Sequence, residues 1–176
     1  MPARAARLLC NIVKPLTENE IRAAFINCSK GEAKRLNLPA NLAEQPWDDL
    51  DFLGWRDQKA PERAYLAAEL DGRLVALVLR CPGPGQPQLR TNMCSVCLTS
   101  HTGGVTLMVA ARTGKAGQQG NTVGDYFCSD LNCSLYVRGL KAVRGIGGRL
   151  PSGLTPEEKA EQITGNLAAF VAKVTA

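Results

Sequence analysis

Four cysteines are the residues in this sequence most clearly spaced for chemistry. Cys94 and Cys97 form a CxxC pair, and Cys128 and Cys133 form a CxxxxC pair further along the chain. A zinc ion takes four soft ligands in a tetrahedron, and two short-spaced pairs supply them when a hairpin brings the pairs together. The spacing therefore predicts one structural Zn²⁺ ion bound by these four thiolates.

Three other uses of the cysteines compete with structural zinc. A catalytic zinc keeps one coordination position open, whereas four cysteines fill the shell. A redox CxxC typically opens a helix in a thioredoxin-like setting, and residues 98–101 give no such context. Spacing alone does not distinguish an iron–sulfur cluster from zinc. Structural zinc is the favoured interpretation.

The sequence offers little else for catalysis. His101 is the only histidine, and with four cysteines available and no carboxylate at motif spacing we interpret it as an ordinary turn residue. The chain has no phosphate-binding GxxxxGK[ST] loop, no HExxH and no serine elbow. We therefore predict a protein that is not an enzyme and has no small-molecule substrate.

The elements expected around the cysteines follow the order of a treble clef. After the knuckle of the first pair come a strand over Val105–Ala111, a Gly- and Gln-rich loop over Thr113–Asn121, and a returning strand over Thr122–Phe127. A helix is expected to start at the second pair. The positive end of its dipole favours thiolate over thiol, which helps to hold the negative charge of the site.

Antiparallel strands and capped helices are expected elsewhere. Apolar runs at Arg63–Leu70 and Arg73–Arg80, joined by an Asp-Gly pair, predict a hairpin. Capping patterns predict a helix over Glu18–Cys28, and a second short helix that starts near Ser29 and ends before a proline. The segment Pro46–Arg56 concentrates aromatic residues among aspartates, and we expect the aromatics to fill a small core while the aspartates face water.

The chain is expected to end in an amphipathic helix. Thr155 and Glu158 make a capping box with proline at the first turn. The apolar stripe that follows is interpreted as core contact and consists of Ile163, Leu167, Phe170, Val171 and Val174. The predicted fold class is therefore α+β, with antiparallel hairpins, a treble-clef zinc finger with four cysteine ligands, a helical N-terminal segment and a C-terminal amphipathic helix.

Length and composition favour a single domain. The 176 residues are 45% hydrophobic, which suits one globular unit, expected over residues 15–176 after a disordered tail at 1–14. No window approaches the roughly 18 apolar residues of a membrane span. Seven cysteines without an export signal make a disulfide framework unlikely and point to a cytoplasmic protein with reduced thiols.

Positive charge is concentrated around the cysteines. Between Arg90 and Arg149 there are seven basic residues against two acidic ones, whereas the rest of the chain is balanced. Such a segment favours an acidic partner, either RNA or an acidic protein surface, although four thiolates on one zinc ion return negative charge to it.

The cysteine segments resemble a known family. The run Cys94-Ser95-Val96-Cys97, together with Gly124–Cys133 (GDYFCSDLNC), resembles the C-terminal treble-clef zinc finger of the elongation factor G-binding proteins, the FusB group of fusidic acid resistance proteins. The similarity extends from about Leu16 to Val174. It looks like the short actinobacterial members that carry this domain alone.

The resemblance implies a function without bond chemistry. A member of this family is expected to bind elongation factor G and to promote its release from the ribosome. The sequence leaves no room for the N-terminal helical bundle of the resistance proteins, which puts drug rescue in doubt. The resemblance carries over the four zinc ligands, and we offer as surface candidates near the finger Lys115, Asn121, Tyr126 and Arg138.

Two other functions remain open from sequence. The first is a zinc-dependent module that binds RNA or the ribosome directly, which the local positive charge supports equally well. RNA recognition usually adds aromatic stacking platforms, and the basic segment has few aromatics, so protein binding is ranked higher. The second is a zinc module used only for structure within a larger assembly.

Overall fold

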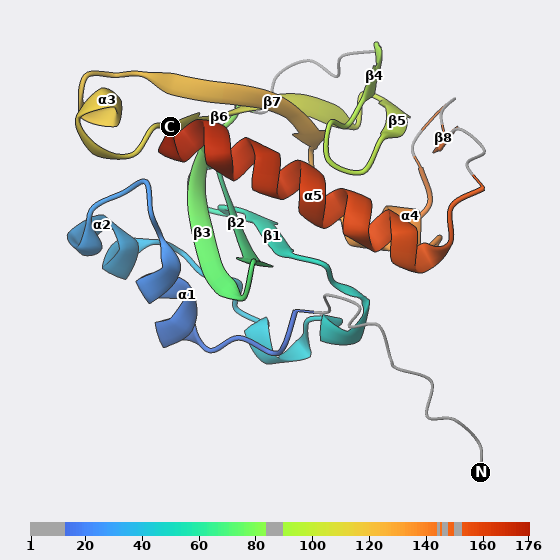
Figure 1. Cartoon of the computed structure of the whole chain (residues 1–176), viewed down its shortest axis with the longest axis horizontal. Coiled ribbons are helices and arrows are strands. Elements are labelled where there is room, and N and C mark those ends of the chain that lie inside the picture. Colours follow the sequence, from blue (N-terminus) through green and yellow to red (C-terminus); the bar gives the residue numbers. More distant parts are fainter. Residues whose placement is uncertain (1–12, 84–89, 144, 146–147, 150–152) are drawn as a thin grey trace.

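The computed structural model describes residues 13–83, 90–143, 145, 148–149 and 153–176 (Figure 1). The helices are α1 (Glu18–Ala24), α2 (Lys30–Arg35), α3 (Gly114–Gln118), α4 (Cys133–Val137) and α5 (Pro156–Thr175), with 3-10 turns at Leu42–Glu44 and Trp47–Asp49. The strands are β1 (Leu53–Arg56), β2 (Arg63–Leu70), β3 (Arg73–Arg80), β4 (Thr91–Met93), β5 (Thr99–Thr102), β6 (Val105–Ala111), β7 (Thr122–Cys128) and β8 (Gly148–Arg149).

The strands form two antiparallel sheets. The larger has the order β1-β2-β3-β6-β7 and the smaller the order β4-β5-β8. The predicted β2–β3 hairpin is confirmed: Leu70 pairs with Arg73, and the two turn residues have φ of 51° at Asp71 and 73° at Gly72. A two-residue turn with both φ values positive matches the twist of the flanking strands. The α+β prediction is therefore correct.

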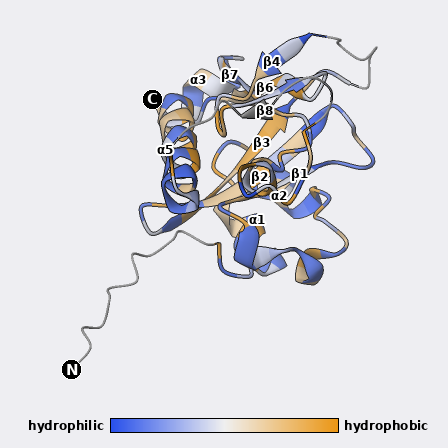
Figure 2. Cartoon of the chain, turned by 90° about the vertical axis from the view of Figure 1, so that its right-hand side faces the viewer, coloured by the Kyte–Doolittle hydropathy of each residue, from blue (hydrophilic) through white to orange (hydrophobic). Residues whose placement is uncertain are grey.

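The larger sheet separates two apolar cores. On one face of β2, Leu66 and its alternate neighbours pack with α5 and the cysteine region. On the other face, Tyr65 packs with the N-terminal helices and with Trp47 and Trp55. Figure 2 shows α5 on one side of the apolar strands and α1 on another. Because both faces of β2 are covered, its apolar residues run almost continuously instead of alternating.

The N-terminal helix begins where the capping box predicts but ends sooner. Thr17 caps α1, and the helix stops at Ala24, ahead of the expected end at Cys28. The chain then becomes extended: the N–H of Ile26 donates to the oxygen of Ala76 in β3 at 3.1 Å. β3 is free to accept there because it pairs with β6 only near its end, at Arg80. Tertiary pairing thus replaces the last helical turn.

The predicted disordered tail at 1–14 falls largely outside the described residues. Val13, within that range, is 2% exposed, and its N–H donates to the oxygen of Leu50 at 3.0 Å. The described chain is therefore packed from its first residue.

The aromatic segment behaves only partly as expected. Trp47, Phe52 and Trp55 are buried in the cores, as predicted. The aspartates do not all face water, since the side chain of Asp51 is 0% exposed and pairs with Arg138. A buried carboxylate needs such a partner because desolvation of an unpaired charge is costly.

Gly54 in β1 lies where the sheet touches the cysteine loop. A Cβ atom at Gly54 would lie 2.5 Å from the Cβ of Leu131 and 3.0 Å from a ring carbon of Phe52. Leu131 has a φ of 58°, so its backbone has little freedom to adjust. Gly54→Ala is therefore expected to lower the free energy of unfolding by about 1–3 kcal/mol, as measured by urea denaturation.

The matched control for Gly54 is Gly165 in α5. A Cβ there meets nothing within 4 Å, so Gly165→Ala is expected to leave stability unchanged or raise it by up to about 1 kcal/mol. Equal stability of both variants would contradict the contact assigned to Gly54.

Candidate metal centre

The first cysteine pair lies on a tight turn between two strands of the smaller sheet. Cys94 directly follows β4, and one residue separates Cys97 from β5. The N–H of Leu98 donates to the oxygen of Cys94 at 2.9 Å, and the N–H of Cys94 donates to the oxygen of Thr99 at the same distance. Leu98 has a φ of 56°. This turn points both thiols the same way.

The second pair joins the larger sheet to a helix. Cys128 ends β7 and Cys133 begins α4, as the treble-clef order predicts. The two pairs are held together by the segment before Cys128: the N–H of Ser95 donates to the oxygen of Tyr126 at 2.8 Å, and the Ser95 hydroxyl donates to the carboxylate of Asp125. These bonds fix the first turn against β7.

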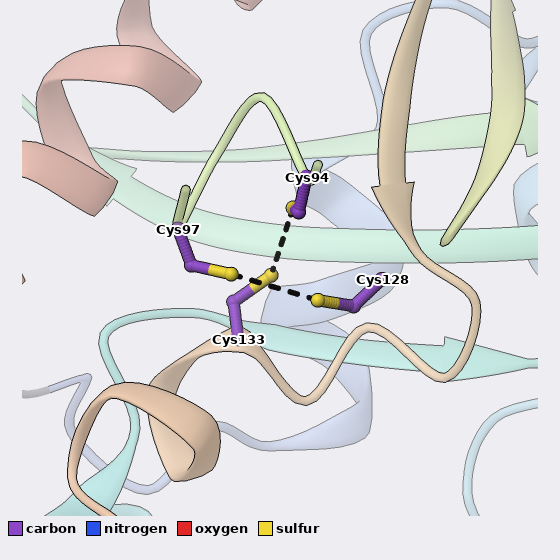
Figure 3. Close-up of side chains that lie close together, drawn as sticks. All are labelled: Cys94, Cys97, Cys128 and Cys133. Carbon is purple, nitrogen blue, oxygen red and sulfur yellow. Dashed lines mark hydrogen bonds between the residues drawn. The ribbon is translucent and has the colours of Figure 1, made fainter. Parts of the chain in front are cut away.

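The four sulfur atoms converge on one point (Figure 3). All four cysteines are 0% exposed, and their sulfurs lie within 4.8 Å of one another. The Sγ atoms of Cys94 and Cys133 are 3.7 Å apart, and those of Cys97 and Cys128 are 3.5 Å apart.

These separations fit a single zinc ion. Four ligands at a Zn–S distance of about 2.3 Å form a tetrahedron with edges of about 3.8 Å, whereas a disulfide would need about 2.05 Å. Sulfurs this close together leave no room for the several metal atoms of an iron–sulfur cluster. With four protein ligands, the ion has no open position for substrate, so it is a structural Zn²⁺ ion.

His101 lies beside this centre. It belongs to β5 rather than to a turn and is 0% exposed, so its interpretation as an ordinary turn residue was wrong. Its Nε2 is 3.5 Å from the sulfur of Cys128. Its ring packs edge-on against the ring of Tyr136, with the two ring centroids 4.4 Å apart. In the tautomer with its proton on Nε2, the ring N–H points at this sulfur and offsets part of the charge of a thiolate ligand. Spacing from Cys97 was the only sequence signal for this contact.

Zinc binding at this centre is expected to depend on pH. Without the ion, contact with the sulfur of Cys128 and then with the other sulfurs, together with burial, raises the pKa of Cys133 well above its ordinary value. The metal-free site therefore holds protons that zinc must displace, and acidification favours the metal-free form. As the pH falls, apparent zinc affinity is expected to drop about tenfold per pH unit for each proton released, measured with a chromogenic chelator from pH 7.5 down to about pH 3.

Asp57 provides an internal reference for that titration. Burial raises its pKa, but the hydroxyl of Tyr65 and the N–H groups of Lys59, Asn37 and Ala60 outweigh burial, so its pKa lies below the usual value. Its contribution to stability is therefore present above the ordinary carboxyl pKa of about 3.9 and is lost below it. Zinc release that began only in that lower range would contradict thiolate protonation as its cause.

The four predicted surface candidates are not all placed alike. Lys115 in α3 and Asn121 just before β7 are exposed at the tip of the β6–β7 hairpin. Tyr126 lies further along β7 and is 46% exposed. Arg138 follows α4, and its side chain is only 15% exposed. Lys115, Asn121 and Tyr126 belong to the β6–β7 hairpin, which lies between the two cysteine pairs in sequence. Arg138 follows the second pair.

Arg138 has a structural contact that sequence reasoning missed. Its Nη1 and Nη2 donate to the two carboxylate oxygens of Asp51 at 2.6 Å and 2.8 Å. The hydroxyl of Ser134 accepts from the N–H of Asp51 at 2.9 Å. Two residues of the α4 region therefore hold the aromatic segment. Asp51 lies 87 positions from Arg138, so no local pattern indicates the pair.

The geometry agrees with what known proteins show. A family model described as "FBP C-terminal treble-clef zinc-finger" matches residues 20–174. A solved structure of the fusidic acid resistance protein FusC superposes with a TM-score of 0.52 at 16% sequence identity, covering 82% of this chain and 54% of that one. The chain thus spans about half the length of FusC. No curated protein sequence gives a significant match. Among the described helices, none has the length and apolar character to cross a membrane.

Proposed function

Because the chain belongs to the FBP C-terminal treble-clef zinc-finger family, we propose that it is a non-enzymatic zinc-binding protein that binds translation elongation factor G in the cytoplasm. The observation that carries the proposal is the complete finger: the family match includes all four cysteines, and their sulfurs converge on one buried site. In this function the zinc ion fixes the shape of the binding domain, and no bond is made or broken.

The proposal extends to release of the factor from the ribosome. The likeness in fold to a fusidic acid resistance protein supports this step. A binding protein shifts an equilibrium only by its difference in affinity for the two states. The chain must therefore bind the released conformation of elongation factor G more tightly than the ribosome-bound one.

Recovery of the factor from cell lysate tests the proposal. Zinc-loaded protein is immobilised, lysate is applied with and without nuclease, and retained proteins are identified by mass spectrometry. Elongation factor G retained after nuclease treatment supports direct binding. Release is then measured by sedimentation of ribosomes with bound factor and fusidic acid, where added protein should move the factor to the supernatant. Failure of the immobilised protein to retain purified elongation factor G would overturn the proposal.

Direct binding to RNA or the ribosome is the second candidate function. The observation in its favour is the positive charge between Arg90 and Arg149. The structure lowers the share of that charge that is unpaired, because Arg138 pairs with Asp51 and Lys141 pairs with Asp130. Retention of ribosomal proteins that is lost after nuclease treatment would favour this candidate.

A further inference from the structure

The β6–β7 hairpin exposes two large apolar side chains next to each other. Leu107 is 43% exposed and Tyr126 is 46% exposed. The two residues are directly opposite in the antiparallel register of β6 and β7, so their side chains stand on the same face of the sheet. We call this face the Leu107–Tyr126 surface.

The N-terminal helices cover only part of that sheet face. Register places Arg80, Val109 and Gly124 in one row across β3, β6 and β7, and Val109 shares its face with Leu107 because side chains alternate along a strand. On β3 the same face carries Ala76, which is buried against the N-terminal helices. Figure 1 and Figure 2 both show α1 away from β6 and β7. The N-terminal helices therefore cover one part of the face. The segment between α1 and α2 reaches the end of β6, where the side-chain amide of Asn27 donates to the oxygen of Ala111 at 3.3 Å. Leu107 and Tyr126 stay exposed.

Gly124 leaves room beside the Leu107–Tyr126 surface for two side chains of β6. A Cβ atom at Gly124 would lie 3.1 Å from Cγ1 of Val109 and 3.3 Å from Cδ1 of Leu107. These two side chains therefore lie over Gly124 and fill the space that a larger residue would take.

Two exposed basic residues lie on the strands and hairpin that carry the surface. Arg80 is exposed and stands opposite Val109. Lys115 is exposed at the tip of the same hairpin. Neither makes an ion pair with another described residue. Asp125 belongs to the opposite face and already accepts from Ser95, with Lys173 3.9 Å away.

We propose that the Leu107–Tyr126 surface is the docking site for a folded protein partner that presents an apolar side chain flanked by carboxylates. The inference rests on the proposed function, which supplies elongation factor G as the partner to test. Apolar contact at the centre supplies the affinity, and the cations around it select an acidic partner surface.

Charge and composition favour this occupant over two others. A second copy of the chain would bring Arg80 of one protomer towards the cationic surroundings of the other, and like charges at an interface oppose association. RNA binding to a sheet relies on stacking against several aromatic rings. The central pair here is one aliphatic and one aromatic residue.

Three variants test the surface by titration with purified elongation factor G. Leu107→Glu and Tyr126→Ser are each expected to raise the dissociation constant at least about tenfold. The matched control is Leu140→Glu, because Leu140 is 60% exposed on the segment after α4 and is expected to change the constant by less than about twofold. Zinc content and circular dichroism establish that each variant is folded.

The outcomes separate the surface from the proposed function. Wild-type binding that both hairpin variants weaken, while Leu140→Glu does not, supports the inference. If the wild-type protein binds elongation factor G and all three variants bind it equally well, the assignment of the docking surface is overturned. The proposed function is then unaffected. No wild-type binding overturns both. Two results would overturn the assigned occupant. One is a dimer of the chain that Leu107→Glu dissociates. The other is that the two hairpin variants lose binding to RNA but keep binding to elongation factor G.

Discussion

Cys128→Ser is expected to abolish zinc binding and to lower the free energy of unfolding by about 5 kcal/mol or more. Serine is a poor zinc ligand, and the three remaining sulfurs would stay concentrated in a site that is 0% exposed. The ion also joins Cys94 and Cys97 of one turn to β7 and α4, so its loss removes the link between these elements. Metal analysis and thermal unfolding measure both effects.

Cys28 and Cys81 are the controls for this prediction. Both are free cysteines outside the four-sulfur cluster. Cys28→Ser is expected to keep the full zinc content, because Cys28 is partly exposed and packs in the core on the other side of the sheet from the metal ligands. Cys81 is buried but is not a metal ligand. Cys81→Ser is therefore expected to lower the free energy of unfolding while zinc stays bound. A Cys128→Ser protein with one bound zinc ion and an unchanged melting temperature would refute the assignment.

Arg138→Ala is expected to lower the free energy of unfolding by about 3–5 kcal/mol. The change leaves the carboxylate of Asp51 buried without the guanidinium that now donates to both its oxygens. Replacing both residues by leucine should recover much of the loss, because no charge is then buried. Urea denaturation of the single and double variants measures the coupling.

Lys141→Ala is the exposed counterpart of that variant. Lys141 and Asp130 are 40% and 36% exposed, and pairs exposed to solvent contribute about 0–1 kcal/mol. Similar losses from Arg138→Ala and Lys141→Ala would contradict the buried role of Arg138. The comparison also decides how Arg138 should be treated in binding experiments, since a variant that unfolds loses partner binding for reasons unrelated to contact.

The amino-acid sequence by itself determined the features that depend on neighbours along the chain. The zinc ligands were readable because each pair lies on one turn or at one helix start, where spacing sets geometry. The Asp71–Gly72 turn and the capping box of Thr155 were readable for the same reason. Within each cysteine pair, at the turn and at the cap, the contact closes a short loop, so a local pattern of residue types is sufficient to predict it. The meeting of the two pairs depends on the β6–β7 hairpin between them.

Only the tertiary structure decided which distant surfaces meet. The pairing of Asp51 with Arg138, the early end of α1 at Ala24 and the contact of His101 with Cys128 depend on segments brought together by sheet order. The same holds for the exposed Leu107 and Tyr126, because their strands read as ordinary half-buried strands whichever element covers them. Burial and charge pairing between distant segments depend on how the helices pack against the sheets. The spacing of residues within one segment does not predict that packing.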